Sequence, residues 1–168
     1  MITFILGGAR SGKSRHAQQL TEAAASGRVL IATAQALDDE MAARIQRHIE
    51  DRDESWTTIE EPLNICDRLL RGIDQNHAVL VDCLTLWLSN LMHAGLDVDA
   101  DIKRLVQTLQ KVSHPLTLVS NEVGMGIVPA SRIGRDFRDL QGQLNQAVAA
   151  VCDRVEFVAA GIPLTLKG

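Results

Sequence analysis

The chain has 168 residues, of which 46% are apolar, 23% charged and 3% aromatic. This length fits one compact domain, so we expect a single domain over residues 1–168, without separate catalytic and substrate domains. Seventeen basic and 21 acidic residues leave a formal charge of −4. That charge argues against a nucleic-acid partner, because binding a phosphate backbone needs a basic surface. The composition also excludes intrinsic disorder and collagen-like repeats.

Cysteine spacing and hydropathy favour a cytoplasmic protein. Cys66, Cys83 and Cys152 lie far apart and form neither a disulfide framework nor a CxxC metal pair, so we expect reduced thiols. Residues 1–6 lack the basic region of a targeting signal. The most apolar run, residues 79–92, contains Asp82 and is too short to span a membrane.

Short apolar runs alternate with stretches of helical period along the chain. We expect strands at residues 2–6, 29–33, 78–82, 116–120 and 155–159, and a last, antiparallel strand at 162–167. The first five are continuously apolar, as in strands that are buried on both faces. We expect helices at residues 12–25, 38–52, 63–73, 85–94, 99–112 and 131–152. This βαβα order predicts an α/β fold with a mainly parallel sheet and helices on both faces.

The most specific motif is a glycine-rich segment between the first strand and the first helix. It reads Gly7-Gly8-Ala9-Arg10-Ser11-Gly12-Lys13-Ser14 and satisfies the G-x-x-x-x-G-K-[ST] pattern of a P-loop. Its backbone N–H groups and the helix N-terminus are expected to bind phosphate. We expect Lys13 to reach the β- and γ-phosphates and the Ser14 hydroxyl to ligate Mg²⁺. The alternative is a glycine turn with an incidental lysine, but the flanking strand and helix favour the P-loop.

An acidic residue, Asp82, ends the apolar strand at 78–82. Ligands of open α/β sheets bind at the carboxyl ends of the strands, so Asp82 is a second candidate Mg²⁺ ligand beside Ser14. The alternative is that Asp82 caps the helix expected from residue 85. The reaction stays open at this point, because P-loops serve kinases, switch GTPases and motor ATPases alike.

The helix expected at 38–52 carries a histidine between two arginines. His48 has Arg44 and Arg52 four residues to either side, so the three side chains share one face. The flanking cations favour a neutral imidazole with a free lone pair, and the arginines could hold phosphate oxygens beside it. His48 is therefore either a nucleophile for phosphorus or a solvated surface histidine, and the pattern alone favours the surface histidine.

Together, these segments resemble the bifunctional adenosylcobinamide kinase/adenosylcobinamide-phosphate guanylyltransferase family of cobalamin biosynthesis. The matching pieces cover most of the chain: Gly7 to Ser14 with Arg15-His16, Ile31-Ala32-Thr33-Ala34, Asp38-Asp39-Glu40-Met41 with Arg44-Ile45 and His48, Arg52, Trp56-Thr57-Thr58-Ile59-Glu60, Asp82-Cys83-Leu84-Thr85 with Asn90-Leu91, Asn121 to Pro129, Phe137-Arg138-Asp139 with Gly142, and Asn145-Gln146. The Asn-Glu-Val-Gly-x-Gly and Arg-Ile-x-x-His segments are more specific than the P-loop alone. The fold we expect is a P-loop NTPase of the RecA-like kind.

The resemblance implies two reactions. The first is phosphorylation of the aminopropanol hydroxyl of adenosylcobinamide with ATP or GTP. The second is transfer of GMP from GTP to that phosphate, which gives adenosyl-GDP-cobinamide and pyrophosphate through a GMP–histidine intermediate. By resemblance, His48 is this nucleophile and Lys13 is the second catalytic residue. The implied nucleotide-binding residues are Gly7, Gly8, Ala9, Arg10, Ser11, Gly12, Lys13, Ser14, Ile31, Ala32, Thr33, Arg44, Arg52, Glu60 and Asp82, with Glu61 adjacent to Glu60. The resemblance also implies a homotrimer with the corrinoid bound between subunits.

Two other classes of protein stay open: a plain P-loop small-molecule kinase with His48 on its surface, and a nucleotide-gated binding module. The segment from Asn121 to Pro129 is expected as a loop on the ligand side of the sheet or as a simple turn. We expect Trp56 and Trp87 to pack rather than to stack on a ligand. No catalytic role is expected for the other histidines, which are His16, His77, His93 and His114.

Overall fold

The structure, a computed structural model, describes residues 1–35, 55–74 and 76–168. Within these ranges the strands form a seven-stranded sheet of order β3-β2-β4-β5-β1-β6-β7. The strands are β1 (Ile2–Gly7), β2 (Gly27–Ala32), β3 (Trp56–Glu60), β4 (His77–Asp82), β5 (Leu116–Asn121), β6 (Arg154–Ala159) and β7 (Ile162–Lys167). All neighbouring strands pair in parallel except β6 and β7, which are antiparallel. The mainly parallel sheet and the antiparallel last strand are therefore confirmed.

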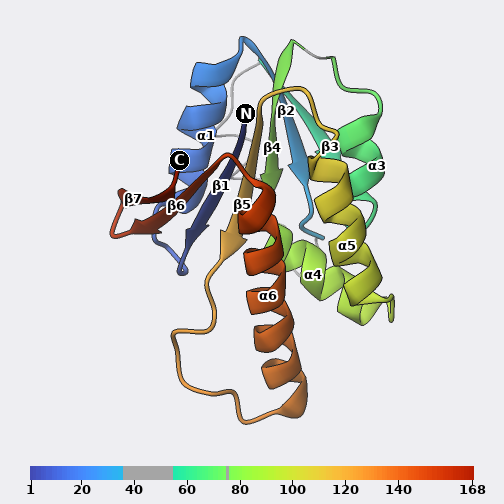
Figure 1. The fold of residues 1–168 in the computed structure, drawn as a ribbon, viewed down its shortest axis with the longest axis vertical. Helices are drawn as coiled ribbons and strands as arrows, with labels where there is room; N and C mark the ends of the chain where they lie inside the picture. Colours follow the sequence, from blue (N-terminus) through green and yellow to red (C-terminus); the bar gives the residue numbers. More distant parts are fainter. Residues whose placement is uncertain (36–54, 75) are drawn as a thin grey trace.

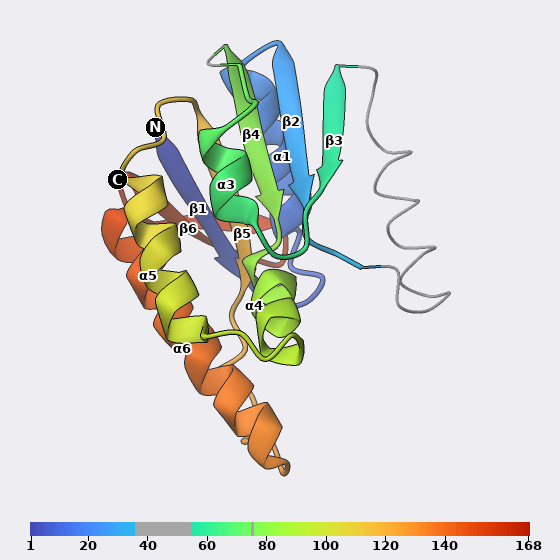
Figure 2. The ribbon, with the colours of Figure 1, turned by 90° about the vertical axis from the view of Figure 1, so that its right-hand side faces the viewer.

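Helices cover both faces of the sheet, as the sequence predicts. The described helices are α1 (Lys13–Ala24), α3 (Ile65–Leu70), α4 (Leu84–His93), α5 (Val98–Leu109) and α6 (Arg132–Val151). Helix α1 lies on one face, and α3, α5 and α6 lie on the other (Figures 1 and 2). Helix α4 lies near the carboxyl ends of the central strands, where the loops that follow β1 and β5 also emerge (Figure 1). The helix expected at 38–52 falls outside the described residues.

Alternate residues of the central strands supply two separate apolar cores. Phe4 joins the larger cluster, with Trp87 and Leu105, whereas its neighbour Ile5 joins the smaller cluster, with Ala17 of α1. Successive side chains of a strand point to opposite faces, so a strand covered on both faces must be continuously apolar. Each fully buried Leu, Ile or Phe contributes about 1.5–3 kcal/mol relative to an exposed one. Burial on both sides therefore fixes the position of β1, whose end carries the P-loop.

Three elements differ from the sequence prediction, and one of them is the helix expected over residues 99–112, which ends at Leu109. Strand β3 was not among the expected strands, because its residues are half-buried or exposed and lack a continuous apolar run. Helix α3 ends at Leu70, so the helix expected over residues 63–73 is too long. Arg71 is extended and Gly72 has a φ of +79°, and both conformations stop the helix.

The environment of the cysteines agrees with the expectation of reduced thiols. Cys66, Cys83 and Cys152 are all buried and unpaired. Burial raises the pKa of the Cys152 thiol to about 12, so it stays protonated near neutral pH. In the part of the chain that the structure describes, no helix has the length and apolar character needed to cross a bilayer.

Candidate triphosphate site

The P-loop connects the carboxyl end of β1 to the first turn of α1. Its backbone needs glycine at two places. Gly12 has a φ of +94°, and a Cβ there would lie 3.1 Å from the Cα of Gly161. A Cβ on Gly7 would lie 2.6 Å from both the Ser11 Oγ and the Val158 carbonyl oxygen. The motif glycines therefore allow the loop to turn back tightly against β6 and the turn that follows it.

Neighbouring segments hold the P-loop backbone from two sides. The Glu122 N–H donates to the Gly7 carbonyl oxygen at 3.1 Å, which joins the residue after β5 to the start of the loop. The Gly161 N–H donates to the Ser11 carbonyl oxygen at 2.8 Å, which joins the β6–β7 turn to its middle. The loop is thus shaped by hydrogen bonds to the segments on either side of it.

Lys13 lies over the loop that it belongs to. Its side chain is 9% exposed, and its Nζ donates to the Gly8 carbonyl oxygen at 2.9 Å. An ammonium group has three N–H donors, so this contact is compatible with donation to a phosphate oxygen as well. Ser11 is also buried, and among the residues that the structure describes its Oγ has no hydrogen-bond partner. A lysine ammonium and an unpartnered hydroxyl inside a glycine-rich turn are donors suited to an anion.

Asp82 ends β4 at the same edge of the sheet, and β5 lies between β4 and β1. Asp82 is not the N-cap of α4, because that position is taken by Cys83, whose side chain makes no capping hydrogen bond. Burial, with a smaller contribution from the Asp82 carboxylate, raises the pKa of the Cys83 thiol to about 11, so the thiol stays protonated near neutral pH.

The two oxygen groups expected to hold a metal ion are available at this edge. Ser14 and Asp82 are half-buried, and within residues 1–35, 55–74 and 76–168 neither side chain makes a hydrogen bond to the chain. A hydroxyl and a carboxylate are hard oxygen donors, which Mg²⁺ prefers, and Mg²⁺ usually takes its other ligands from water and phosphate. The residues present therefore fit a magnesium ion.

The end of β2 lies beside Asp82 and also holds the backbone that follows Asp82 in place. Ile31 belongs to the buried core, whereas Ala32 pairs with Glu60 on one side and Asp82 on the other. Thr33 is fully buried, and its Oγ1 accepts the Cys83 N–H at 2.8 Å and donates to the Cys83 carbonyl oxygen at 2.7 Å. The Thr33 hydroxyl therefore joins the end of β2 to the residue after Asp82.

Two adjacent glutamates follow each other at the end of β3, and their surroundings differ. The Glu61 carboxylate accepts the Asn64 N–H at 2.8 Å and lies 3.3 Å from Arg68, so it holds the start of α3. Glu60 is exposed, and in the described ranges its carboxylate has no partner. Of the pair, Glu60 is the carboxylate available to a ligand.

The structure brings together the P-loop, Asp82, Thr33 and Glu60 at the carboxyl edge of one sheet. Arg44, His48 and Arg52 fall outside the described residues, so their placement relative to this edge stays a prediction. Trp87 packs in the core, fully buried, with its Nε1 donating to the Leu63 carbonyl oxygen at 2.8 Å. That packing role was expected from the sequence.

A buried polar network behind the β5 loop was not predicted. Ser120 Oγ donates to Asn145 Oδ1 at 2.8 Å and accepts from Gln141 Nε2 at 2.9 Å. Asn145 Nδ2 then donates to the Asn121 carbonyl oxygen at 3.0 Å. The network fixes the point where the chain leaves β5 and passes into the loop that extends beyond the sheet (Figure 1). Its signal in the sequence is two amides, four residues apart, on the apolar face of α6.

A phosphate-binding loop that links a buried parallel strand to a helix, with an acidic residue ending a nearby strand, defines a P-loop nucleotide-binding protein. The RadB recombinase, a solved structure of the RecA-like P-loop class, matches this fold. Its TM-score is 0.52 at 15% identity, over 93% of this chain and 73% of that one. The likeness confirms the RecA-like fold class predicted from the sequence.

Sequence comparison places the chain more narrowly. Residues 3–166 match the family described as "Cobinamide kinase / cobinamide phosphate guanyltransferase". The bifunctional adenosylcobalamin biosynthesis protein CobP of Pseudomonas aeruginosa is 44% identical, over 100% of this chain and 98% of its own length. The corresponding protein CobU of Escherichia coli is 42% identical, over 99% of this chain and 100% of its own. The chain belongs to this family and is a bifunctional kinase and guanylyltransferase, which confirms the resemblance seen in the sequence.

Proposed function

We propose that this chain uses one triphosphate site for both of its reactions. In the first reaction the P-loop holds a nucleoside triphosphate, ATP or GTP, and adenosylcobinamide receives its γ-phosphoryl group. In the second, GTP occupies the same site and GMP passes to adenosylcobinamide phosphate through His48. The observation that carries this proposal is that the P-loop motif folds into a donor-lined turn in a chain that matches the family over residues 3–166.

In the kinase step, the aminopropanol hydroxyl oxygen bonds to the γ-phosphorus and loses its proton. The bond from that phosphorus to the β–γ bridging oxygen breaks, and a nucleoside diphosphate leaves. Lys13 and the backbone N–H groups of the loop stabilise the negative charge on the phosphate oxygens. Ser14 and Asp82 are the residues that would hold Mg²⁺, which when bound neutralises charge on the β- and γ-phosphates.

In the transfer step, an imidazole nitrogen of His48 bonds to the α-phosphorus of GTP, and pyrophosphate leaves. An oxygen of adenosylcobinamide phosphate then bonds to the same phosphorus, and the bond to the histidine breaks. A protein nucleophile divides the transfer into two steps and keeps the GMP activated until the acceptor arrives. Arg44 and Arg52, four residues to either side of His48, are proposed to hold the phosphate oxygens during both steps.

The nucleotide pocket we propose contains the whole P-loop, the end of β2 and two acidic residues. The backbone around Ala32 and Thr33 lies beside Asp82, and Glu60 provides an exposed carboxylate next to it. A carboxylate in this position is suited to accept N–H groups of a purine base or hydroxyl groups of a ribose.

We also propose that residues 1–168 act as one domain, that the enzyme is a homotrimer, and that the corrinoid binds between subunits. Met125, Ile127 and Val128 are 81%, 98% and 59% exposed in the loop that begins beside the P-loop. Exposed apolar residues clustered next to a site support contact with a large ligand or another subunit. A monomeric mass in solution would contradict this assembly. The buried, reduced thiols and the nucleoside triphosphate substrates support a cytoplasmic location.

Incubation with GTP labelled at the α-phosphate tests the proposed function. We expect label to become attached to the protein in a linkage that is labile to acid and stable to base. We also expect adenosylcobinamide phosphate to remove that label. A plain P-loop kinase and a nucleotide-gated binding module would both leave the protein unlabelled, so an unlabelled protein with kinase activity would disprove the shared-site transferase.

Asp82→Asn is expected to weaken the use of Mg²⁺ in both reactions. Removing the charge while keeping the shape should raise the Mg²⁺ concentration needed for half-maximal rate by about 10- to 100-fold. Asp99→Asn, in the exposed first turn of α5, is the matched control and should leave the Mg²⁺ titration unchanged. An unaltered titration for Asp82→Asn would show that this carboxylate does not serve the metal ion.

A further inference from the structure

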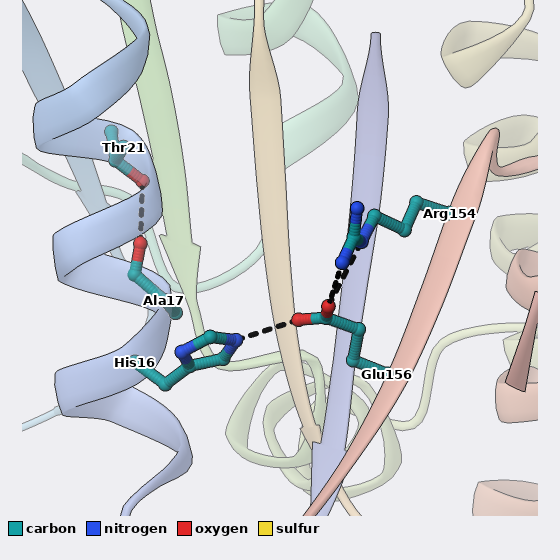
Figure 3. Close-up of polar contacts among 5 residues, drawn as sticks. All are labelled: His16, Ala17, Thr21, Arg154 and Glu156. Atoms are coloured by element: carbon teal, nitrogen blue, oxygen red, sulfur yellow. Dashed lines mark hydrogen bonds and ion pairs between the residues drawn. The ribbon is translucent and has the colours of Figure 1, made fainter. Parts of the chain in front are cut away.

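Three polar side chains connect α1 to β6 around the buried Glu156, with His16 half-buried and Arg154 exposed (Figure 3). The Glu156 side chain is 3% exposed, and its Oε2 lies 2.6 Å from Nε2 of His16. Its other oxygen, Oε1, accepts from Nε and Nη2 of Arg154 at 2.8 and 2.5 Å. The Glu156 carboxylate thus contacts His16 of α1 through one oxygen and Arg154 of its own strand, β6, through the other.

Glu156 is ionised in this arrangement. Burial alone would raise the pKa of the Glu156 carboxyl group. The hydrogen bonds and charges of His16 and Arg154 lower the pKa by more than burial raises it, so the net pKa lies below the ordinary value. An ionised carboxylate only accepts hydrogen bonds, so the Nε2 of His16 carries the proton that lies between the two groups. Removing either partner would leave a buried charge incompletely paired.

His16 belongs to the same helical turn as the catalytic part of the P-loop. It is three residues after Lys13 and two after Ser14, and its backbone N–H donates to the Gly12 carbonyl oxygen at 3.0 Å. A displacement of His16 would therefore move the residues before it. The hydrogen bond between His16 and Glu156 therefore constrains the segment that carries the Lys13 ammonium and the Ser14 hydroxyl.

Further along α1, the Arg28 guanidinium of β2 donates to the Glu22 carbonyl oxygen at 3.3 Å near the end of the helix, and apolar packing holds the part between. Ala17 packs into the smaller apolar core, and the Thr21 hydroxyl donates to the Ala17 carbonyl oxygen within the helix at 2.8 Å (Figure 3). A charge-assisted hydrogen bond is short and directional, so it fixes the direction and distance between its partners more closely than apolar packing does. The His16–Glu156 pair supplies the direction.

Strand β6 and the turn after it therefore support the P-loop at two points. Glu156 holds the first turn of α1, and Gly161 binds the Ser11 carbonyl oxygen. We propose that His16 and Glu156 are positioning residues, which keep Lys13 and Ser14 in place for the triphosphate without touching it. This inference rests on the proposed role of the P-loop as the triphosphate site.

The test compares two substitutions of similar size at one position. In His16→Leu the contact with Glu156 is lost, and kcat should fall by about 10- to 100-fold in both reactions, because a small displacement of reacting groups has effects of this order. In His16→Gln an amide N–H can replace the imidazole N–H, and kcat should stay near the wild-type value. The KM for the corrinoid substrates should be unchanged in both variants.

Thr21→Ala controls for simple loss of helix stability. Thr21 is 1% exposed and lies five residues further along the same helix, so its truncation should lower Tm while kcat stays unchanged. All variants are assayed well below their Tm. Should His16→Leu fail to fold, His16→Asn replaces it, because its amide is too short to reach Glu156.

Each outcome of these assays either supports or overturns the positioning role of His16. A wild-type kcat in His16→Leu or His16→Asn would overturn the positioning role. A lower kcat in Thr21→Ala, in proportion to its lower Tm, would also overturn it, because loss of helix stability would then explain the effect. An inactive His16→Gln would overturn it too, because hydrogen-bond replacement would not restore function. Failure of the P-loop assignment itself gives a different result, which is wild-type activity in Lys13→Ala.

Discussion

His48→Ala is expected to abolish GMP transfer while the kinase reaction continues at close to its normal rate. The substitution removes the only nitrogen nucleophile that the proposed pathway offers to the α-phosphorus, and phosphorylation of the corrinoid hydroxyl does not use it. Protein labelling from α-labelled GTP should fall to background. Formation of adenosylcobinamide phosphate, measured separately with γ-labelled triphosphate, should persist.

The matched control is His93→Ala, because His93 is an exposed histidine at the end of α4 whose ring hydrogen-bonds only with Ser89 within the described residues. Its labelling should equal that of the unmodified chain. If His48→Ala still accepts labelled GMP, the nucleophile lies elsewhere, and digestion of the labelled protein would locate it. If both activities are lost together, His48 serves binding or folding rather than one chemical step.

Lys13→Ala is expected to lower the rates of both reactions by about 10²- to 10³-fold, the effect typical of removing one donor that stabilises charge in a transition state. Lys13 is buried against the loop, and its ammonium contacts the Gly8 carbonyl oxygen. Its loss therefore removes a positive charge from the proposed triphosphate site. Initial rates of kinase and transfer reactions, measured over a range of triphosphate concentrations, give kcat and KM for each.

Lys103→Ala, on the exposed side of α5, is the control for loss of one positive charge and should retain both rates. A Lys13→Ala enzyme that loses only one of the two activities would show that the reactions use different triphosphate sites. The pair of substitutions thus distinguishes a shared site with two chemistries from two independent sites: Lys13 should affect both reactions, and His48 only one.

The sequence predicted the features that depend on local pattern. The P-loop was recognisable because its residues are contiguous, and the buried strands because burial on both faces demands continuous apolar runs. Strand β3 lies at one end of the described sheet and is partly exposed, so it carries no such run. The residues of β3 match the family pattern in the sequence, but that match does not predict a strand there.

The His16–Glu156 contact could not be predicted from the sequence. A glutamate in the middle of the apolar segment Val155-Glu156-Phe157-Val158 signals a buried charge that needs a partner. The partner, however, lies 140 residues away in the sequence. Only the parallel pairing of β1 with β6, which places α1 against β6, brings the two together. The choice between Glu60 and Glu61 likewise needed the contacts of Glu61 with the start of α3.

The placement of β1 between β5 and β6 has a consequence for how the enzyme is made. Ile2 pairs with Leu116 and Thr3 with Arg154, so the strand that carries the P-loop finds its neighbours only after most of the chain has been synthesised. Contacts between such distant segments form late, because a large loop must close first. During translation the phosphate-binding motif emerges early but acquires its support last. Nucleotide binding should therefore appear only in chains that have completed β6, which separates synthesis of the motif from onset of its activity.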